Sequence, residues 1–472
     1  MTIIVSIFTK VTNDVIKKCY ENKLIVRVVI SDMGTANQKM WLDAGILSNR
    51  TSLVNFIIHP SNPLLKIFFM ADPPHLLKSI RNCLLNNDII LPTIEETEHL
   101  KSKLVSLNHL KLVNQFQKTS NLKLLPGNTD DFFNLSNYKK MRVDMAAKLL
   151  SHSAASALYF MNSIGAAPLE VTTTAFFCDK VNEWFDILNN RTAHKFKKTT
   201  LENEISIIKN MSNLIKNISF SDNKKWKPIQ KGIILTNETI MNLYSELTLD
   251  KIDFLFGRMN QDCIENLFSQ IRSKSDSNPS ALKFKINLKL VTISNYLKLS
   301  VKTNYNTDDS IYLLNMLQIK EKNELEQNDE VNFIKILEEE TMNSNLIYYI
   351  TGWNLFKEKL MCEECTLNYI NMTNASNETS IFTHLKSYGK LIHPTTKLLN
   401  FFSSVNSFID SCNLLQEVYN IENELLNKCI NDVSFKIINC ECHQHLINMI
   451  KRFIRLKLHT FAKEISNKNY LQ

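Results

Sequence analysis

The stretch VVISDMGTANQKMW, residues 28–41, decides the fold of this chain together with the distant stretch DCIENLFS, residues 262–269. Residues 24–31 are mostly apolar and β-branched, which predicts a strand buried on both faces that ends at the carboxylate of Asp32. Glu265 falls on the polar face of a predicted amphipathic helix. Two acids brought together from distant parts of a chain are what a two-metal site for phosphoryl transfer requires. On spacing alone, a strand-end cap for Asp32 and a solvated helix face for Glu265 are the simpler interpretation.

Helices and buried strands alternate on both sides of Asp32, which is the repeat unit of an α/β sheet. Residues 9–22 are predicted to form a helix and residues 64–71 a second strand. Asp72 follows that strand, where it is either a third metal-binding acid or the N-cap of the next helix. The periodicity is then helical from about 92 to 220, which predicts a large all-α insertion. The expected long helices are those at 93–118, 139–162 and 172–190.

The composition is that of a globular protein, with 44% hydrophobic and 22% charged residues among 472. The net charge of +8 suits a polyanionic partner such as nucleic acid, although an excess spread over so long a chain is weak evidence. The sequence shows neither a signal peptide nor a run of about 18 apolar residues. We therefore expect an intracellular protein with no membrane partner.

Several longer stretches resemble the P-element transposases and, more broadly, the THAP-domain transposases. They occur in the order of that family and cover roughly residues 10–300. The matching stretches are VISDMGTANQKMW at 29–41, KIFFMADPPHLLKSIRN at 66–82, WFDILN at 184–189, QKGII at 230–234 and RMNQDCIENLF at 258–268. Because several long signatures agree in order and approximate spacing, the resemblance is specific.

The resemblance implies an α/β fold of the RNase H-like (DDE/D transposase) type, interrupted by a helical GTP-binding insertion and followed by a helical C-terminal domain. In that family three acids hold Mg²⁺ or Mn²⁺ for DNA cleavage and strand transfer; Asp32 resembles the second of them and Glu265 the third. The expected domains are the first part of the core at 1–80, the insertion at 81–250, the second part of the core at 251–300, a linker at 301–340 and the C-terminal domain at 341–472.

The same resemblance implies that the insertion binds GTP as a structural cofactor. Asp186 would accept hydrogen bonds from N1 and N2 of guanine, Phe185 would stack on the base, and Arg142 would suit a phosphate. No glycine-rich phosphate loop is present, and core packing of Phe185 is the alternative interpretation. The positions that the resemblance assigns to the nucleotide site are Arg142, Val143, Phe185, Asp186, Asn189 and Asp262.

In that family a THAP zinc domain, a coiled coil and three strands precede the counterpart of the helix at 9–22. The sequence shows none of them, so the first-strand acid is missing. We therefore expect a truncated gene model or a degenerate copy rather than a self-sufficient enzyme. The alternative is a catalytically inactive, domesticated derivative that binds DNA or protein and acts like a repressor. A metal-dependent nuclease on the same fold is a third class, against which the long insertion argues.

Two cysteine-containing pairs near the C-terminus suggest a structural zinc site. Cys362 and Cys365 form a Cys-x-x-Cys pair, and Cys442 with His445 offers two further ligands. Inside the cell, zinc is favoured over a disulfide, although the separation of the pairs is long for a compact finger and free thiols are the alternative. The partners expected from the resemblance are DNA (transposon ends and target), GTP and further copies of the chain, in the nucleus.

Overall fold

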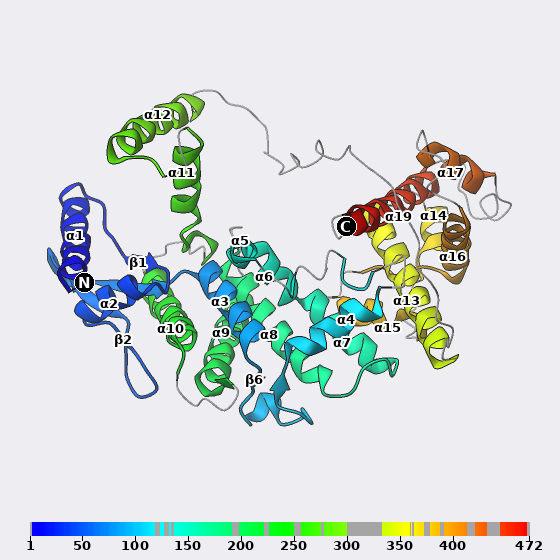
Figure 1. Ribbon diagram of the computed structural model, residues 1–472, viewed down its shortest axis with the longest axis horizontal. Coiled ribbons are helices and arrows are strands. Elements are labelled where there is room, and N and C mark those ends of the chain that lie inside the picture. The colour runs from blue at the N-terminus through cyan, green and yellow to red at the C-terminus, as the bar shows by residue number, and fades with distance from the viewer. Residues whose placement is uncertain are drawn as a thin grey trace. The chain divides into compact units, whose positions relative to one another are not determined.

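The computed structural model describes most of the 472 residues, and Figure 1 shows their helices and strands. The described residues are 2–118, 123–126, 132–133, 136–190, 198–220, 226–249, 256–274, 278–299, 333–358, 360, 363–371, 378–387, 391–412, 421–431 and 444–469. They fall into two compact units. The first comprises residues 1–76, 187–205 and 227–327, and the second comprises 77–186, 206–226 and 328–472.

A three-stranded sheet lies at the centre of the first unit. Its order is β1 (Val28–Ser31), β5 (Asn62–Ala71) and β4 (Phe56–His59). β5 runs parallel to β1 and antiparallel to β4, and the residues from Ile67 to Ala71 are at most 1% exposed because both faces of this central strand are covered. The two strands predicted from the sequence are confirmed, although the first is shorter than residues 24–31. The short strand β4 was not predicted.

Helix α10 (Pro228–Leu249) packs against β5 and satisfies its backbone. The hydroxyl of Thr236 accepts from the N–H of Ala71 and donates to its carbonyl, both at 3.0 Å, and Thr239 donates to the carbonyl of Phe69 at 2.7 Å. A Cβ on Gly232 would come within 2.7 Å of Leu76, so this glycine permits the close approach. α10 lies in the range predicted for the insertion, yet it packs on the sheet of the first unit.

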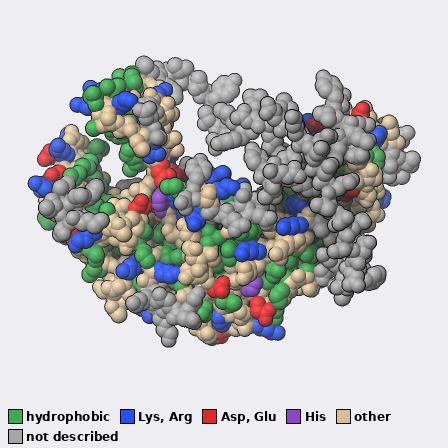
Figure 2. All heavy atoms as spheres, viewed as in Figure 1, with side chains coloured by type: hydrophobic (Ala, Val, Ile, Leu, Met, Phe, Trp, Pro, Cys, Tyr) green, Lys and Arg blue, Asp and Glu red, His purple; other side chains and the backbone are tan. Residues whose placement is uncertain are grey.

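The other elements of the first unit include α1 (Thr2–Glu21), which contains most of the helix predicted at residues 9–22. The remaining ones are α2 (Thr35–Asp43), the hairpin of β2 (Leu47–Ser48) and β3 (Leu53–Val54), η3 (Phe256–Arg258), α11 (Asp262–Ser273) and α12 (Ala281–Leu299). α11 is the amphipathic helix predicted around Glu265, and Ile271 is its buried residue. α12 exposes four apolar side chains, those of Leu282, Ile286, Leu290 and Ile293. Figure 2 shows hydrophobic side chains gathered over this part of the molecule.

The second unit is mainly helical and includes one small sheet. Its sheet has the order β7 (Leu104–Val105), β6 (Ile89–Ile90) and β8 (Ser219–Phe220). Its helices that precede residue 300 are α3 (Pro73–Asn86, which begins in the first unit), η1 (Glu95–Thr97), α4 (Leu107–Phe116), α5 (Asn137–Lys140), α6 (Val143–Leu149), α7 (His152–Ser163), α8 (Val171–Leu188, which ends in the first unit) and α9 (Lys198–Asn217, which also begins in the first unit). Those after it are α13 (Phe333–Glu358), α14 (Glu363–Tyr369), η4 (Glu378–Ser380), α15 (Ile381–Lys386), α16 (Thr396–Ser411), α17 (Ile421–Ile430) and α19 (His445–Asn469).

Of the three long helices predicted in the insertion, two predictions are wrong. Residues 93–118 contain a 3₁₀ turn, the strand β7 and only then α4, whose start is capped by the hydroxyl of Ser106. Residues 139–162 form three helices, because Arg142 is extended and Ser151 begins a new helix by accepting from the N–H of Ala154. The predicted helix at 172–190 is confirmed as α8. Most of the predicted linker at 301–340 lies outside the described residues, and the chain is helical from Phe333.

Candidate functional site

The carboxylate of Asp72 joins two separate segments of the first unit. Asp72 is 1% exposed and directly follows β5. Its Oδ2 accepts from the backbone N–H of His75 at 3.0 Å, which caps α3, and its Oδ1 accepts from the N–H of Gln261 at 2.7 Å, just before α11. Burial is the main cause that raises the pKa of Asp72. Since both oxygens bind backbone donors, the geometry supports the N-cap interpretation rather than metal binding.

Asp32 lies at the same edge of the sheet, because β1 and β5 are parallel and Ser31 is opposite Ala71. Its Oδ1 accepts from the backbone N–H of Gly34 and from the amide of Asn37, both at 2.7 Å. A Cβ on Gly34 would lie 2.8 Å from this oxygen, so glycine permits the contact. The half-buried Asp32 is therefore held in place through Oδ1.

Glu265 reaches this region through His75. Its Oε1 lies 3.0 Å from Nε2 of His75, and its side chain is 56% exposed. The contact between Asp72 and Gln261 places the first turn of α11 beside the start of α3, which brings Glu265 toward the sheet edge. In the described part of the chain, however, no three His, Cys, Asp or Glu side chains are grouped closely enough to hold a metal ion. Asp32 and Glu265 therefore supply two candidate ligands but not a complete metal site.

A cavity of about 390 Å³ in the second unit contains the other main candidate residue. Its described lining residues come from α7 and the turn before it, from α8, from α13, from α15 and from a segment after α15. They are Ser151, His152, Ser153, Asn182, Asp186, Tyr349, Lys386 and Leu391. Its volume falls in the usual range of small-molecule pockets. The lining offers acceptors, donors and a cation, which suits a polar ligand that carries an anionic group.

Asp186 projects from the exposed side of α8 into this lining. Asn182, one turn earlier, donates to its Oδ2 at 2.7 Å. Partial burial raises the pKa of Asp186, while the Asn182 hydrogen bond and nearby His152 act in the opposite direction. His152 itself lies 2.6 Å from Asp179, and this hydrogen bond raises its pKa against the effect of burial. The carboxylate is thus oriented by an amide, and its remaining lone pairs can accept from a ligand.

The other predicted nucleotide-site residues are spread over several elements. Phe185 is 8% exposed and packs into the core, as the alternative interpretation had it. Arg142 precedes α6 and binds Asp144 through two hydrogen bonds of 3.0 and 2.6 Å, and Val143 is the half-buried first residue of α6. The two remaining positions, Asn189 and Asp262, belong to the first unit. The backbone carbonyl of Asn189 lies close to Gly257, where an added Cβ would come within 2.7 Å of it. The carboxylate of Asp262 accepts a hydrogen bond from the amide of Asn260 at 3.0 Å.

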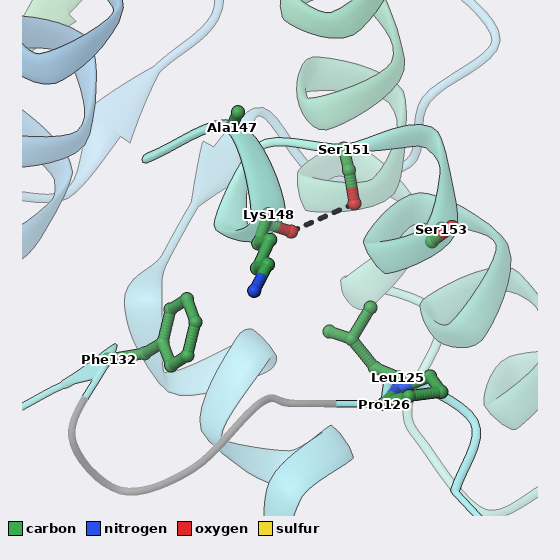
Figure 3. A pocket seen from close by; sticks show the side chains of 7 residues that line it. All are labelled: Leu125, Pro126, Phe132, Ala147, Lys148, Ser151 and Ser153. Carbon is green, nitrogen blue, oxygen red and sulfur yellow. Dashed lines mark hydrogen bonds between the residues drawn. The ribbon is translucent and has the colours of Figure 1, made fainter. Parts of the chain in front are cut away.

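A second, more apolar cavity of about 280 Å³ adjoins the turn at Ser151. Figure 3 shows Lys148 reaching into it between Phe132 and Leu125, while Ser151 donates to the carbonyl of Lys148 at 2.8 Å. Ser151 and Ser153 line both cavities. The turn before α7 therefore separates an apolar hollow from the polar one that contains Asp186.

The predicted zinc ligands are only partly described. Cys362 and Cys442 lie outside the described residues. Cys365 is fully buried on α14, and His445 is 7% exposed at the start of α19, with its Nδ1 3.0 Å from Oε1 of Glu358. A carboxylate contact of this kind orients many zinc-binding histidines. The zinc site stays a prediction.

Sequence reasoning missed the residues that surround Asp186. Asn182 lies four residues before Asp186 on one helix, so the helical period alone would have placed their side chains together. No local sequence pattern indicated that His152 lies near Asp186. Lys386 lies 200 residues beyond Asp186 in the chain, and no sequence pattern connects the two.

Comparisons with known proteins agree with this organisation. The model of the family "TNP-like, GTP-binding insertion domain" matches residues 74–200. The Transposable element P transposase of Drosophila melanogaster is 26% identical over 500 residues, which cover 98% of this chain and 61% of that protein. The DNA transposase THAP9 of Homo sapiens is 27% identical over 281 residues, covering 55% of this chain and 30% of that protein.

A solved structure is also similar, the "Drosophila P element transposase strand transfer complex". It aligns with a TM-score of 0.52 and 28% identity over 60% of this chain and 63% of that chain. The chain described here thus spans less than two thirds of the length of these relatives.

The fold and the comparisons define the class as a helix-rich α/β protein of the transposase type that contains a TNP-like GTP-binding insertion domain. The chain is a homologue of the P element transposases, as its resemblance to that family predicted. None of the described helices combines the length and the apolar character that a membrane span needs.

Proposed function

We propose that the second unit binds a guanine nucleotide in the cavity lined by Asp186. The observation that supports this most directly is the position of that carboxylate: it lines a cavity of about 390 Å³ and belongs to the segment that the GTP-binding insertion family matches. Guanine presents two adjacent N–H donors on one edge, and a carboxylate can accept from both. Asn182 holds the carboxylate in position for this role.

The nucleotide assignment predicts that GTP, unlike ATP, stabilises the whole chain against heat. Asp186→Asn should weaken GTP binding roughly 10- to 100-fold, because an amide replaces one of the two acceptors with a donor and removes the charge. Thermal shift with graded GTP concentrations measures the effect, since a ligand present at about 100 times its Kd adds about 2.7 kcal/mol of stability.

Glu183→Gln is the matched control for Asp186→Asn. Glu183 lies on the same helix and pairs with Lys180 at 2.9 Å, but it does not line the cavity. This variant should bind GTP as the unmodified chain does. Equal stabilisation of the unmodified chain by ATP and GTP, or an unchanged GTP affinity in Asp186→Asn, would contradict the assignment.

We further propose that the first unit belongs to an RNase H-like transposase core that acts on DNA. The strand-end position of Asp32 beside β5 and the contact of Glu265 with His75 support this. When bound, Mg²⁺ or Mn²⁺ would activate water or a DNA hydroxyl for attack on a phosphodiester. Asp32 and Glu265 would supply two of the ligands, and the contacts of Asp32 with Gly34 and Asn37 would keep one carboxylate oriented.

Metal binding by these two acids can be tested without an activity assay. Titration of the whole chain with Mn²⁺, followed by calorimetry, should show a site that Asp32→Asn or Glu265→Gln weakens at least about tenfold. Asp43→Asn is the control, because Asp43 lies on nearby α2 and pairs with Lys39 at 2.8 Å. Mn²⁺ affinities equal in all four proteins would remove these acids from the site.

The relatives, rather than the described site, suggest the activity of the whole protein. We propose DNA transposition in the nucleus, with transposon ends and target DNA as partners and with assembly of several copies, for a protein that contains this chain. A catalytically inactive derivative that binds DNA or protein is the second candidate. It is supported by the observation that no three possible metal ligands are grouped together among the residues the structure describes. The Mn²⁺ titration separates the two, because the derivative needs no metal.

A further inference from the structure

Lys386 is the last residue of α15 and lines the same cavity as Asp186, although it lies far outside the segment that the family model matches. Its ammonium group sits over two aromatic rings, 4.5 Å from the centre of the Tyr349 ring and 5.2 Å from that of Phe382. Cation–π contacts of this kind hold an ammonium group in position. They leave its hydrogen-bond donors available to an oxygen-bearing ligand.

The charge of Lys386 has no carboxylate to balance it within the described residues. In the described part of the chain no ion pair joins Asp186 to Lys386 although both line the cavity, and burial lowers the pKa of Lys386 to about 8. Burial of an ammonium group away from a counter-ion is unfavourable, and the aromatic rings offset this only in part. A cation held in this way beside a cavity is suited to an anionic ligand.

The position of Lys386 is set by packing of α15 on α7. The hydroxyl of Ser156 donates to the carbonyl of Leu385 at 3.1 Å, and the rings of Phe160 and Phe382 meet edge to face at 5.4 Å. On the other side, Asn345 of α13 accepts from the N–H of Phe382 at 3.1 Å. The position of the ammonium group is therefore set by a helix that packs against α7 and α13.

We propose that Lys386 binds a phosphate group of the guanine nucleotide, so that the C-terminal helical segment completes the nucleotide site of the insertion. This rests on the proposed nucleotide binding and deepens it. Asp186 would bind the base edge and Lys386 the phosphate, since the two line one cavity without forming an ion pair. A phosphate of DNA has the same chemistry, but a cavity of about 390 Å³ that also offers a base-binding carboxylate suits a mononucleotide better.

The test compares guanosine, GTP and pyrophosphate as ligands of the whole chain by calorimetry. Lys386→Met keeps the length and the apolar stem of the side chain but removes the charge. It should weaken GTP and pyrophosphate binding about tenfold or more and leave guanosine binding unchanged. Lys386→Arg should restore most of the GTP affinity. Lys397→Met is the control, because Lys397 is exposed on α16 and does not line the cavity.

Each outcome separates this proposal from the nucleotide assignment itself. GTP binding by Lys386→Met equal to that of the unmodified chain, with loss in Asp186→Asn, would overturn the role of Lys386 alone. Pyrophosphate binding that depends on Lys386, in a chain that binds neither guanosine nor GTP, would support an anion site and overturn the nucleotide assignment. Loss of affinity for a short single-stranded DNA, with GTP affinity unchanged, would identify DNA as the source of the phosphate. Melting curves of all variants would test whether each of them is folded.

Discussion

Replacing Glu358 by alanine should destabilise the second unit by about 3 kcal/mol, the lower end of the range for breaking a buried ion pair. The side chain of Glu358 ends α13 and is 4% exposed. It lies 3.0 Å from Nδ1 of His445, accepts from the amide of Asn448 at 2.9 Å, and forms an ion pair with Arg452. The alanine variant would leave these three groups of α19 without their common acceptor, and the hydrogen bonds of Asn354 with Met449 and Arg452, both 3.4 Å long, would remain as polar contacts of α13 with α19.

The effect of the Glu358 substitution should depend on pH. Burial raises the pKa of Glu358, but the hydrogen bonds from Asn448, His445 and Arg452 outweigh it and hold the pKa below its ordinary value of 4.5. A carboxyl group with a lowered pKa stabilises the folded state above its unfolded pKa and loses this contribution as the pH falls through the folded value. The difference in unfolding free energy between Glu358→Ala and the unmodified chain should therefore be largest near pH 7 and shrink below about pH 4.

Urea unfolding at several pH values measures this difference. Glu363→Ala is the control, because Glu363 is exposed on the neighbouring helix α14. This variant should unfold at the same urea concentration as the unmodified chain. A Glu358→Ala variant that unfolds at the same urea concentration as the unmodified chain would show that the Glu358 contacts contribute nothing to holding α19.

Replacing Asp72 by alanine should destabilise the first unit by about 2–4 kcal/mol, because it leaves two partly buried N–H donors without the carboxylate that accepts from both. Those donors belong to His75 at the start of α3 and Gln261 before α11. Asp72→Asn should cost less, since its carbonyl oxygen can still accept one of the two bonds. The same substitutions should weaken Mn²⁺ binding through Glu265, because Asp72 holds the start of α11 in place.

The measurement for Asp72 combines chemical unfolding with the Mn²⁺ titration. Asp43→Ala is the control, as an acid on the surface of α2 whose removal should change the unfolding free energy by less than about 0.5 kcal/mol. A free energy of unfolding of Asp72→Ala equal to that of the unmodified chain would mean that water satisfies both donors. Loss of stability with unchanged Mn²⁺ affinity would separate the cap from the metal site.

Much of the first unit could be predicted from its sequence. The apolar run before Asp32 and the run before Asp72 predicted β1 and β5, because a strand buried on both faces needs continuous apolar residues. The amphipathic pattern around Glu265 predicted α11. The short strand β4 was missed because its four residues show no clear alternation, and its pairing with β5 decides its conformation.

The insertion was predicted as helical, but its breaks were not located. The two-residue strand β6 pairs with β7 and also with β8, so that Ile89 lies opposite Phe220. No local pattern signals a strand of two residues, and one of its two partner strands lies 131 residues away in the chain. The turn at Ser151 was missed for a different reason: the apolar spacing continues through it, and the cap is formed by one hydroxyl.

The sequence by itself determined the family of this chain and the acids that end its first strand and begin α11, because these depend on long local signatures. It also singled out Asp186. Only the tertiary structure decided what surrounds that carboxylate. Asn182 comes from the same helix, but Lys386 and Tyr349 reach the cavity because α15 packs on α7 through Ser156 and the aromatic rings. A site built from segments about 200 residues apart is defined by packing, and packing between distant segments leaves no periodic signal in the chain.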